Sequence, residues 1–250
     1  MNKCVATLLL LIVSWSSIAQ NKIRRLDELL NITDPGWPFV QKMIDSAKNK
    51  IEVLPCDTNK AKLALYQTQV SSRSPMGAII YNTGGMLIDG GWIRILGSGS
   101  KIINRTLPDW NKGKSYKNFG EIPGYYLIAD DAVGGFFAVN NGFLGKATGK
   151  VFYLSPDRLI WEPLDMTYTD FLYFCFNDNL NNFYENLRWP NWKKDVAKLK
   201  GDKVFNFYPY LWTKEGKNII KNKRRIIPVE EQFQFNMQSR KQLGLNKIGE

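Results

Sequence analysis

Apolar side chains recur every three to four residues along the chain between residues 23 and 84, and this spacing predicts helices. Asp34 before Pro35 and Ser74 before Pro75 each place a capping residue ahead of a first-turn proline, and Gly84 is suited to a left-handed helix end. The helices expected in this region cover 23–30, 35–47, a segment after residue 57 and a segment from residue 75.

After residue 84 the pattern changes to short β-rich runs separated by glycine, which indicates hairpins. The runs are MLID with WIRIL, YYLIAD with FFAVN, and KVFYLS with LIWEPL. Six strands in hairpin order, with no crossover helices between them, indicate a mainly antiparallel sheet.

Helical spacing returns after residue 166, which gives the sheet helices on the C-terminal side as well. Thr167 is placed to cap the first of these helices, with Asp170 at the acid position of a capping box. VFNFYPYLW reads as an aromatic extended piece and GKNIIKNKRR as a basic loop. The further helices are expected at 179–187, 192–199 and 229–243. The chain is therefore predicted to be α+β, with one domain over residues 20–250 flanked by N-terminal and C-terminal helices.

The first nineteen residues have the pattern of a secretory signal peptide. A charged start is followed by the apolar run 4–13 and by small residues up to Ala19. No later window approaches about 18 continuous apolar residues, so no integral membrane segment is expected. We therefore expect cleavage near Ala19 and export to the periplasm or the medium.

The chain contains no histidine, which excludes Ser-His-Asp and Cys-His nucleophile pairs and imidazole zinc sites. Only Cys56 and Cys175 remain after signal cleavage, too few for a thiolate zinc site. The two could form a disulfide in an oxidising compartment, or Cys175 could be a small buried hydrophobe. No metal and no cofactor are expected.

The net charge of +11 raises the question of an acidic partner. Because export separates the protein from nucleic acid, we expect the charge to attract acidic envelope polymers, anionic headgroups or acidic protein surfaces instead.

The glycine-rich stretch 82–100 does not match a nucleotide-binding motif. Lys101 follows a serine where a Walker loop needs glycine, and Ile102 stands where a Rossmann fingerprint needs its third glycine. The glycines are therefore interpreted as turn and strand-end residues.

Several long blocks resemble a known bacterial family. DPGWPFVQ, SPMGAIIYNTGGMLIDGGWIRILGSGS, ADDAVGGFFAVN, RWPNW and FYPYLWTKEG are similar to domain-of-unknown-function family 2625 over nearly all of the mature chain. More loosely, YNTGG, DDAVGGFFAV and GKVFYLSPDRLIWEPL resemble the SUKH superfamily. That resemblance implies an antiparallel sheet flanked by helices and, for many members, an immunity protein that neutralises a toxin domain. With an export signal, such a role would be periplasmic.

The candidate binding residues fall into three groups. Arg94 alternates with apolar neighbours, so it is expected on a solvated strand face or, alternatively, in a ligand cleft. Asp130 and Asp131 are expected in a hairpin turn, either as backbone acceptors or as an acid–base pair. The third group is aromatic and either covers the end of the sheet or forms a binding surface: Trp189, Trp192, Tyr208, Tyr210 and Trp212.

Because the sequence contains no self-sufficient catalytic set, the favoured hypothesis is a non-catalytic binding domain for a protein partner, with a toxin domain as one such partner. The alternatives are a carboxylate-dependent hydrolase, with Asp130 or Asp131 as acid or base, and a glycan-binding module of the cell envelope.

Overall fold

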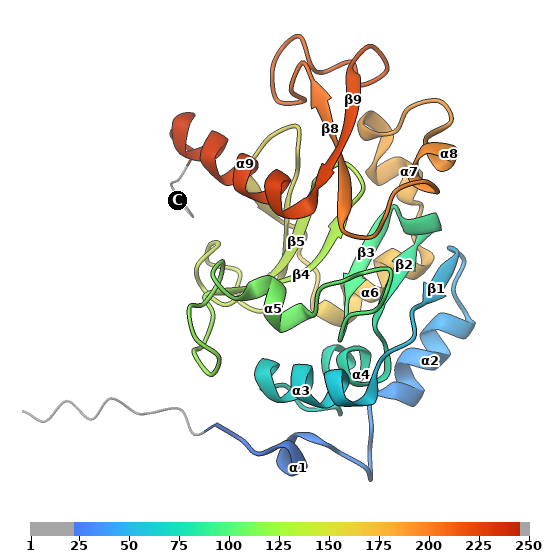
Figure 1. Cartoon of the computed structure of the whole chain (residues 1–250), viewed down its shortest axis with the longest axis vertical. Helices are drawn as coiled ribbons and strands as arrows, with labels where there is room; N and C mark the ends of the chain where they lie inside the picture. The colour runs from blue at the N-terminus through green and yellow to red at the C-terminus, as the bar shows by residue number, and fades with distance from the viewer. Residues whose placement is uncertain (1–22, 246–250) are drawn as a thin grey trace, which may run out of the picture.

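The computed structural model describes residues 23–245 and centres on a seven-stranded antiparallel sheet whose strands lie in chain order (Figure 1). Each strand pairs with its neighbours in sequence, so all six predicted strands are present in the expected hairpins. The three-residue β1 was not predicted, because so short a run carries no measurable alternation. The strands are β1 Ile51–Val53, β2 Gly85–Ile88, β3 Ile93–Leu96, β4 Tyr125–Asp131, β5 Phe136–Asn140, β6 Val151–Leu154 and β7 Trp161–Pro163.

Four helices precede or interrupt the first strands and lie at one end of the molecule (Figure 1). The cap predicted at Ser74 is confirmed, since Ser74 accepts from the Gly77 N–H at 3.1 Å. The helix expected after residue 57 is capped by Asp57, which accepts from the Asn59 and Lys60 N–H groups at 2.9 Å. The helices are α1 Leu26–Leu29, α2 Trp37–Asp45, α3 Thr58–Thr68 and α4 Pro75–Asn82.

Two details of these helix ends differ from the prediction. α2 is capped by Gly36 rather than Asp34, and its proline is Pro38. Gly84 is not left-handed, because α4 ends in an extended Thr83. Gly84 is needed for space instead, since a Cβ there would lie 2.5 Å from the Pro55 carbonyl oxygen.

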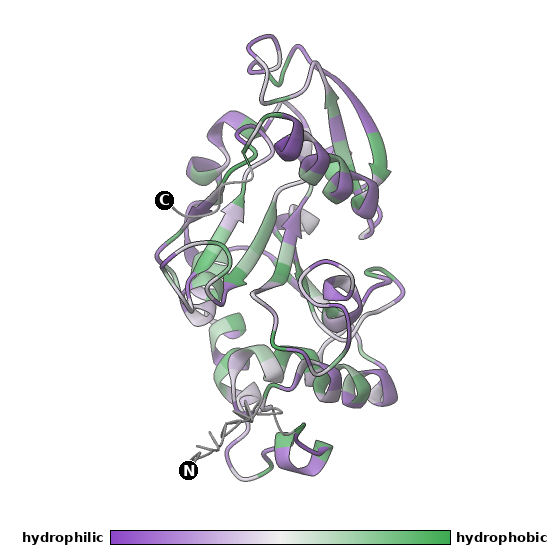
Figure 2. Ribbon diagram, turned by 90° about the vertical axis from the view of Figure 1, so that its left-hand side faces the viewer, coloured by the Kyte–Doolittle hydropathy of each residue, from purple (hydrophilic) through white to green (hydrophobic). Residues whose placement is uncertain are grey.

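Alternating side chains on each strand give the sheet two buried faces. Ile95, Phe137 and Tyr153 belong to the core cluster shared with α2, α6 and α7, whereas Leu96 and Phe136 belong to the one shared with α3, α5 and α9. Figure 2 shows the hydrophobic colour concentrated in the strands. Helices therefore cover both faces, in an α+β arrangement. The remaining helices are α5 Leu107–Asn111, α6 Tyr168–Asn177, α7 Leu180–Phe183, α8 Trp192–Val196 and α9 Val229–Gln242, with 3₁₀ turns at Asp89–Gly91 and Glu185–Leu187.

The capping box predicted for α6 is confirmed, with Thr167 and Asp170 exchanging hydrogen bonds. Part of the segment expected as a basic loop is instead a strand. β9, Lys223–Pro228, pairs with β8, Lys203–Tyr208, in a separate two-stranded ribbon at the far end of the molecule from α1–α4 (Figure 1). Its charged residues concealed the strand, because β propensity is low for lysine.

Cys56 and Cys175 are both free thiols, so the disulfide considered above does not form in the structure. Cys175 lies in the core on α6, as its apolar neighbours indicated, while Cys56 is partly exposed. The predicted signal peptide, residues 1–19, lies outside the described residues. Within 23–245 no helix has the length and apolar character needed to cross a bilayer, and no cluster of acidic or cysteine side chains suits a metal ion.

Candidate functional site

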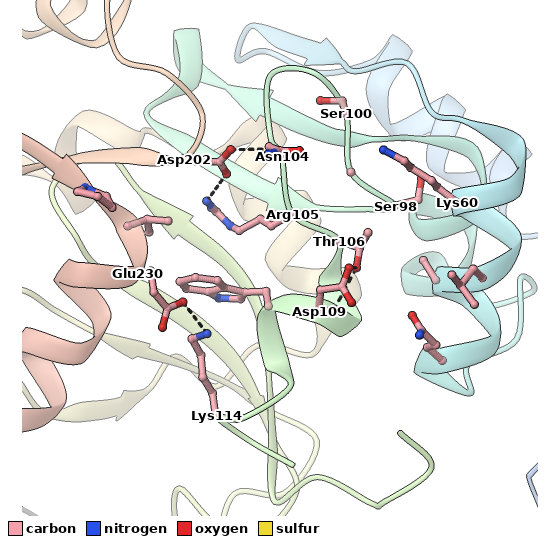
Figure 3. A pocket seen from close by; sticks show the side chains of 17 residues that line it. Lys60, Ser98, Ser100, Asn104, Arg105, Thr106, Asp109, Lys114, Asp202 and Glu230 are labelled. Carbon is pink, nitrogen blue, oxygen red and sulfur yellow. Dashed lines mark hydrogen bonds and ion pairs between the residues drawn. The ribbon is translucent and has the colours of Figure 1, made fainter. Parts of the chain in front are cut away.

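A pocket of about 640 Å³ opens between α3, the loop that follows β3, α5 and the start of α9 (Figure 3). Its polar lining includes three cations and three carboxylates from segments far apart in sequence. Leu63, Ala64 and Val229 supply apolar wall. The charged lining residues are Lys60, Arg105, Lys114, Asp109, Asp202 and Glu230.

Two of the three cations are already paired. Arg105 Nη1 lies 2.7 Å from Asp202, and Lys114 Nζ lies 2.7 Å from Glu230. Both cations also lie over the ring of Trp110, at 4.8 Å and 4.1 Å from its centroid. These contacts fix one side of the pocket and neutralise the charges of Asp202 and Glu230.

Lys60 and Asp109 have no charged partner. The Lys60 ammonium makes no hydrogen bond or ion pair with any residue in 23–245, and its side chain is exposed. Asp109 accepts a hydrogen bond from the Thr106 hydroxyl at 2.7 Å, as part of the α5 cap, and contacts no cation within that range. The pocket thus carries one unpaired charge of each sign.

The end of the glycine-rich stretch, residues 98–100, lines this pocket, and Gly97 and Gly99 have the strand-end roles predicted for them. A Cβ on Gly97 would lie 2.6 Å from the Thr83 carbonyl oxygen, and Gly99 is left-handed with φ +84°. Ser98 donates to the Thr83 carbonyl at 2.8 Å, and Ser100 Oγ accepts from backbone N–H groups at 3.0 and 3.1 Å. The Gly99 N–H donates to no described group. Two residues that line the pocket, Gly99 and Ser100, therefore keep a donor that no described residue uses, although the loop has no nucleotide-binding motif.

Arg94 is not on a solvated face as expected, since only 1% of its surface is exposed. It pairs with Asp130, which is fully buried and pairs with Arg105 as well. Alternation had indicated the correct side of the strand, but that side is covered by the segment entering β8, where Arg94 donates to the Lys203 carbonyl at 2.5 Å. Burial lowers the pKa of Arg94.

Asp130 and Asp131 end β4 rather than occupying the turn, and both are inaccessible to solvent. Asp131 nevertheless acts as a turn acceptor: its Oδ1 accepts from the N–H groups of Val133 at 3.0 Å and Gly135 at 2.8 Å. Its Oδ2 accepts from the hydroxyl groups of two buried tyrosines, Tyr153 at 2.7 Å and Tyr184 at 3.2 Å. Burial raises the pKa of Asp131.

The aromatic residues divide between core and surface. Trp189 and Trp192 are buried against Trp92, with ring centroids 5.9 and 4.8 Å away. Tyr208 is 66% exposed on the β8–β9 ribbon. Tyr210 and Trp212 are partly exposed and stack on each other at 4.8 Å. The surface aromatics therefore belong to the ribbon and the loop after β8.

The family model described as "Protein of unknown function DUF2625" matches residues 26–232. The chain belongs to this family. It is 39% identical over 216 residues to an uncharacterized protein, YbfG, of Escherichia coli K12, covering 86% of this chain and 97% of that one. An uncharacterized protein of Haemophilus influenzae Rd is 40% identical over 223 residues, covering 89% and 98%. No solved structure matches this DUF2625 protein. The SUKH similarity stays a prediction.

The pocket of this DUF2625 protein was not found from its sequence. Lys60, Asp109, Lys114 and Glu230 lie in separate segments with no motif spacing, and each belongs to a residue type that is usually solvated. The serines and glycines beside Lys101 were the one available signal. They match neither a Walker loop nor a Rossmann fingerprint, so they do not indicate a pocket by themselves.

Proposed function

We propose that this protein is an exported, non-catalytic binding domain that recognises an acidic protein partner through its β8–β9 ribbon. The observation that carries the proposal is the charge of this segment. Residues 203–228 contain seven lysines and arginines and a single acid, Glu215. The same ribbon exposes large apolar side chains: Tyr208 at 66%, Ile220 at 62% and Ile226 at 50%. Exposed aromatic and aliphatic groups ringed by charge are typical of protein interfaces.

The ribbon has a free edge that suits such a partner. β9 pairs only with β8 within residues 23–245, so the backbone groups of its other edge face no described strand. Lysine and arginine on an edge strand normally prevent uncontrolled pairing between copies of a protein. An acidic strand would meet no such repulsion, and strand addition is a common mode of recognition.

The positive charges of the ribbon differ in availability. Arg224 lies over the Trp189 ring at 4.6 Å, and Arg225 lies 4.0 Å from Glu231. The ammonium groups of Lys221 and Lys223 contact no described acid, and both residues are exposed. Lys221 and Lys223 are therefore available to pair with an acidic partner.

A non-catalytic role is supported by the state of the acids. Asp130 and Asp131 have no solvent-accessible surface, so a glycosidic bond has no access to them. In the pocket, Asp202 and Glu230 are each paired with a cation, which leaves Asp109 as a single unpaired carboxylate where glycoside hydrolysis uses two. This arrangement favours binding over the hydrolase alternative. Export rests on the predicted signal peptide, and a toxin domain as partner rests on the SUKH resemblance.

The test is affinity capture from an envelope extract of the source organism, followed by measurement with the purified captured protein. Lys221→Glu/Lys223→Glu is compared with Lys42→Glu/Lys62→Glu, which makes the same charge change on α2 and α3. We expect the ribbon variant to weaken binding at least tenfold, with affinity falling as salt rises. Equal affinities for the two double variants would place the interface elsewhere, and a captured component that is glycan would favour the glycan-binding alternative.

A further inference from the structure

We propose that the pocket between α3, α5 and α9 binds a small zwitterionic ligand of the amino-acid or short-peptide class. The proposal does not depend on the ribbon. The protein carries a net charge of +11, yet the pocket lining contains three cations and three carboxylates and is formally neutral. A neutral site in a basic protein does not recruit ligands through net charge, so its selectivity rests on how the charges are placed.

The end of the pocket near Lys60 suits a carboxylate. Figure 3 shows the Lys60 side chain reaching toward the loop that carries Ser98 and Ser100. Three donors are unused there: the Lys60 ammonium, the Gly99 N–H and the hydroxyl hydrogen of Ser100, whose oxygen accepts two backbone hydrogen bonds. A carboxylate is an acceptor for donors of each of these kinds.

Asp109 suits an ammonium group. Among residues 23–245 its carboxylate accepts a hydrogen bond from Thr106 alone, and it is exposed to the pocket. The other two carboxylates are unsuitable because Arg105 and Lys114 neutralise them. A bound ammonium would therefore find one carboxylate available among the lining residues.

The alternatives leave a charge uncompensated. A simple anion at Lys60 would bring negative charge toward Asp109, which like charges disfavour. A neutral polyol would displace water from both groups without supplying an opposite charge to either. A zwitterion compensates both, and the apolar wall of Leu63, Ala64 and Val229 accommodates an aliphatic side chain. The volume of about 640 Å³ lies within the usual range for small-molecule sites.

The experiment is isothermal titration with four matched probes: Ala-Ala, N-acetyl-Ala-Ala, Ala-Ala-amide and maltose. The first is zwitterionic, the second is only anionic, the third is only cationic, and the last is neutral. We expect Ala-Ala to bind at least tenfold more tightly than the other three. Tighter or equal binding of any of those three, or no binding of Ala-Ala, would overturn the proposal.

Variants assign the two ends of the ligand. Lys60→Met is expected to weaken Ala-Ala binding at least tenfold and to remove the preference over Ala-Ala-amide. Asp109→Asn is expected to remove the preference over N-acetyl-Ala-Ala. Lys62→Met, on the same helix but outside the pocket, is the control and should bind like the original protein. Urea midpoints check that all three variants fold, and unchanged selectivity in both pocket variants would contradict the assignment.

Discussion

Arg94 on β3 and Asp130 on β4 are directly opposite each other in the sheet register, and neither side chain reaches solvent. Arg94 Nη2 also donates to the Asp131 carbonyl at 2.7 Å, and Asp130 accepts a second cation, Arg105. A buried charge pair of this kind stabilises only while both members are present, because a lone buried charge loses its hydration without compensation.

We therefore predict that Arg94→Met destabilises the protein by about 3–5 kcal/mol. The loss leaves the Asp130 carboxylate with Arg105 alone and leaves the Lys203 carbonyl without its donor. Urea denaturation followed by tryptophan fluorescence measures the change. Arg94→Met/Asp130→Leu should be less destabilised than the single variant. A double variant that loses the sum of the two single effects would show that the charges do not act as a pair.

Asp131 should make stability pH-dependent. Its pKa is raised above the ordinary 3.8 by burial, so the folded state favours the protonated carboxyl. The contribution of Asp131 to the free energy of unfolding is fully present below the pKa that Asp131 has in the unfolded chain. It is lost as the pH rises through the higher pKa that Asp131 has in the folded protein. The stability of the original protein relative to Asp131→Asn should therefore fall as pH rises above about 4. Urea midpoints at several pH values measure this difference. A constant difference from pH 3 to pH 8 would contradict it.

Cys56 and Cys175 should react at different rates in the protein from which the predicted signal peptide, with Cys4, has been removed. Cys175 is fully buried, and burial raises its pKa far above the ordinary thiol value, whereas Cys56 is partly exposed. We expect one fast and one strongly protected thiol in the folded protein, measured with a chromogenic disulfide reagent. Unfolding without reductant should release two reactive thiols. Finding none would mean that the protein isolated from an oxidising compartment contains the bridge.

Gly84 and Gly90 should differ in tolerance to substitution. A Cβ at Gly84 would meet the Pro55 and Gly99 carbonyl oxygens at 2.5 and 2.7 Å, so Gly84→Ala should cost about 1–3 kcal/mol through overpacking. Gly90 has φ +72° with nothing within 4 Å, and Gly90→Asn should cost less because asparagine tolerates this conformation. Thermal unfolding of the two variants provides the comparison. Equal melting temperatures would contradict the steric argument.

The sequence predicted the sheet well because the signals for its hairpins are local. Runs such as WIRIL alternate between faces, and the turn glycines follow directly, so neighbours in sequence become neighbours in space. The cap at Ser74 depends on contacts within one helical turn and was equally accessible. At Gly84 the neighbouring residues predicted a left-handed helix end, which is wrong. Glycine is needed there because the carbonyl groups of Pro55 and Gly99 leave no space for a Cβ.

The candidate site could not be predicted in the same way. Whether Arg94 is solvated or buried depends on the chain near Lys203, more than one hundred residues later. The pocket depends on the approach of α3, α5 and α9, which no periodicity in any of them specifies. The pattern around Arg94, Asp130 and Asp131 indicated that these residues are unusual, but their partners come from distant parts of the chain and could not be assigned.

The meander also implies an order of assembly during synthesis. All seven strands of the main sheet precede residue 164, and each pairs with the strand before it, so the sheet can form before the rest of the chain is made. Two of its connections are long, since α3 and α4 lie between β1 and β2 and α5 lies between β3 and β4. The Arg94 guanidinium at its centre still lacks the Lys203 carbonyl at that stage. The last fifth of the chain, emerging late from the ribosome, therefore completes the polar centre of the sheet and one wall of the pocket together.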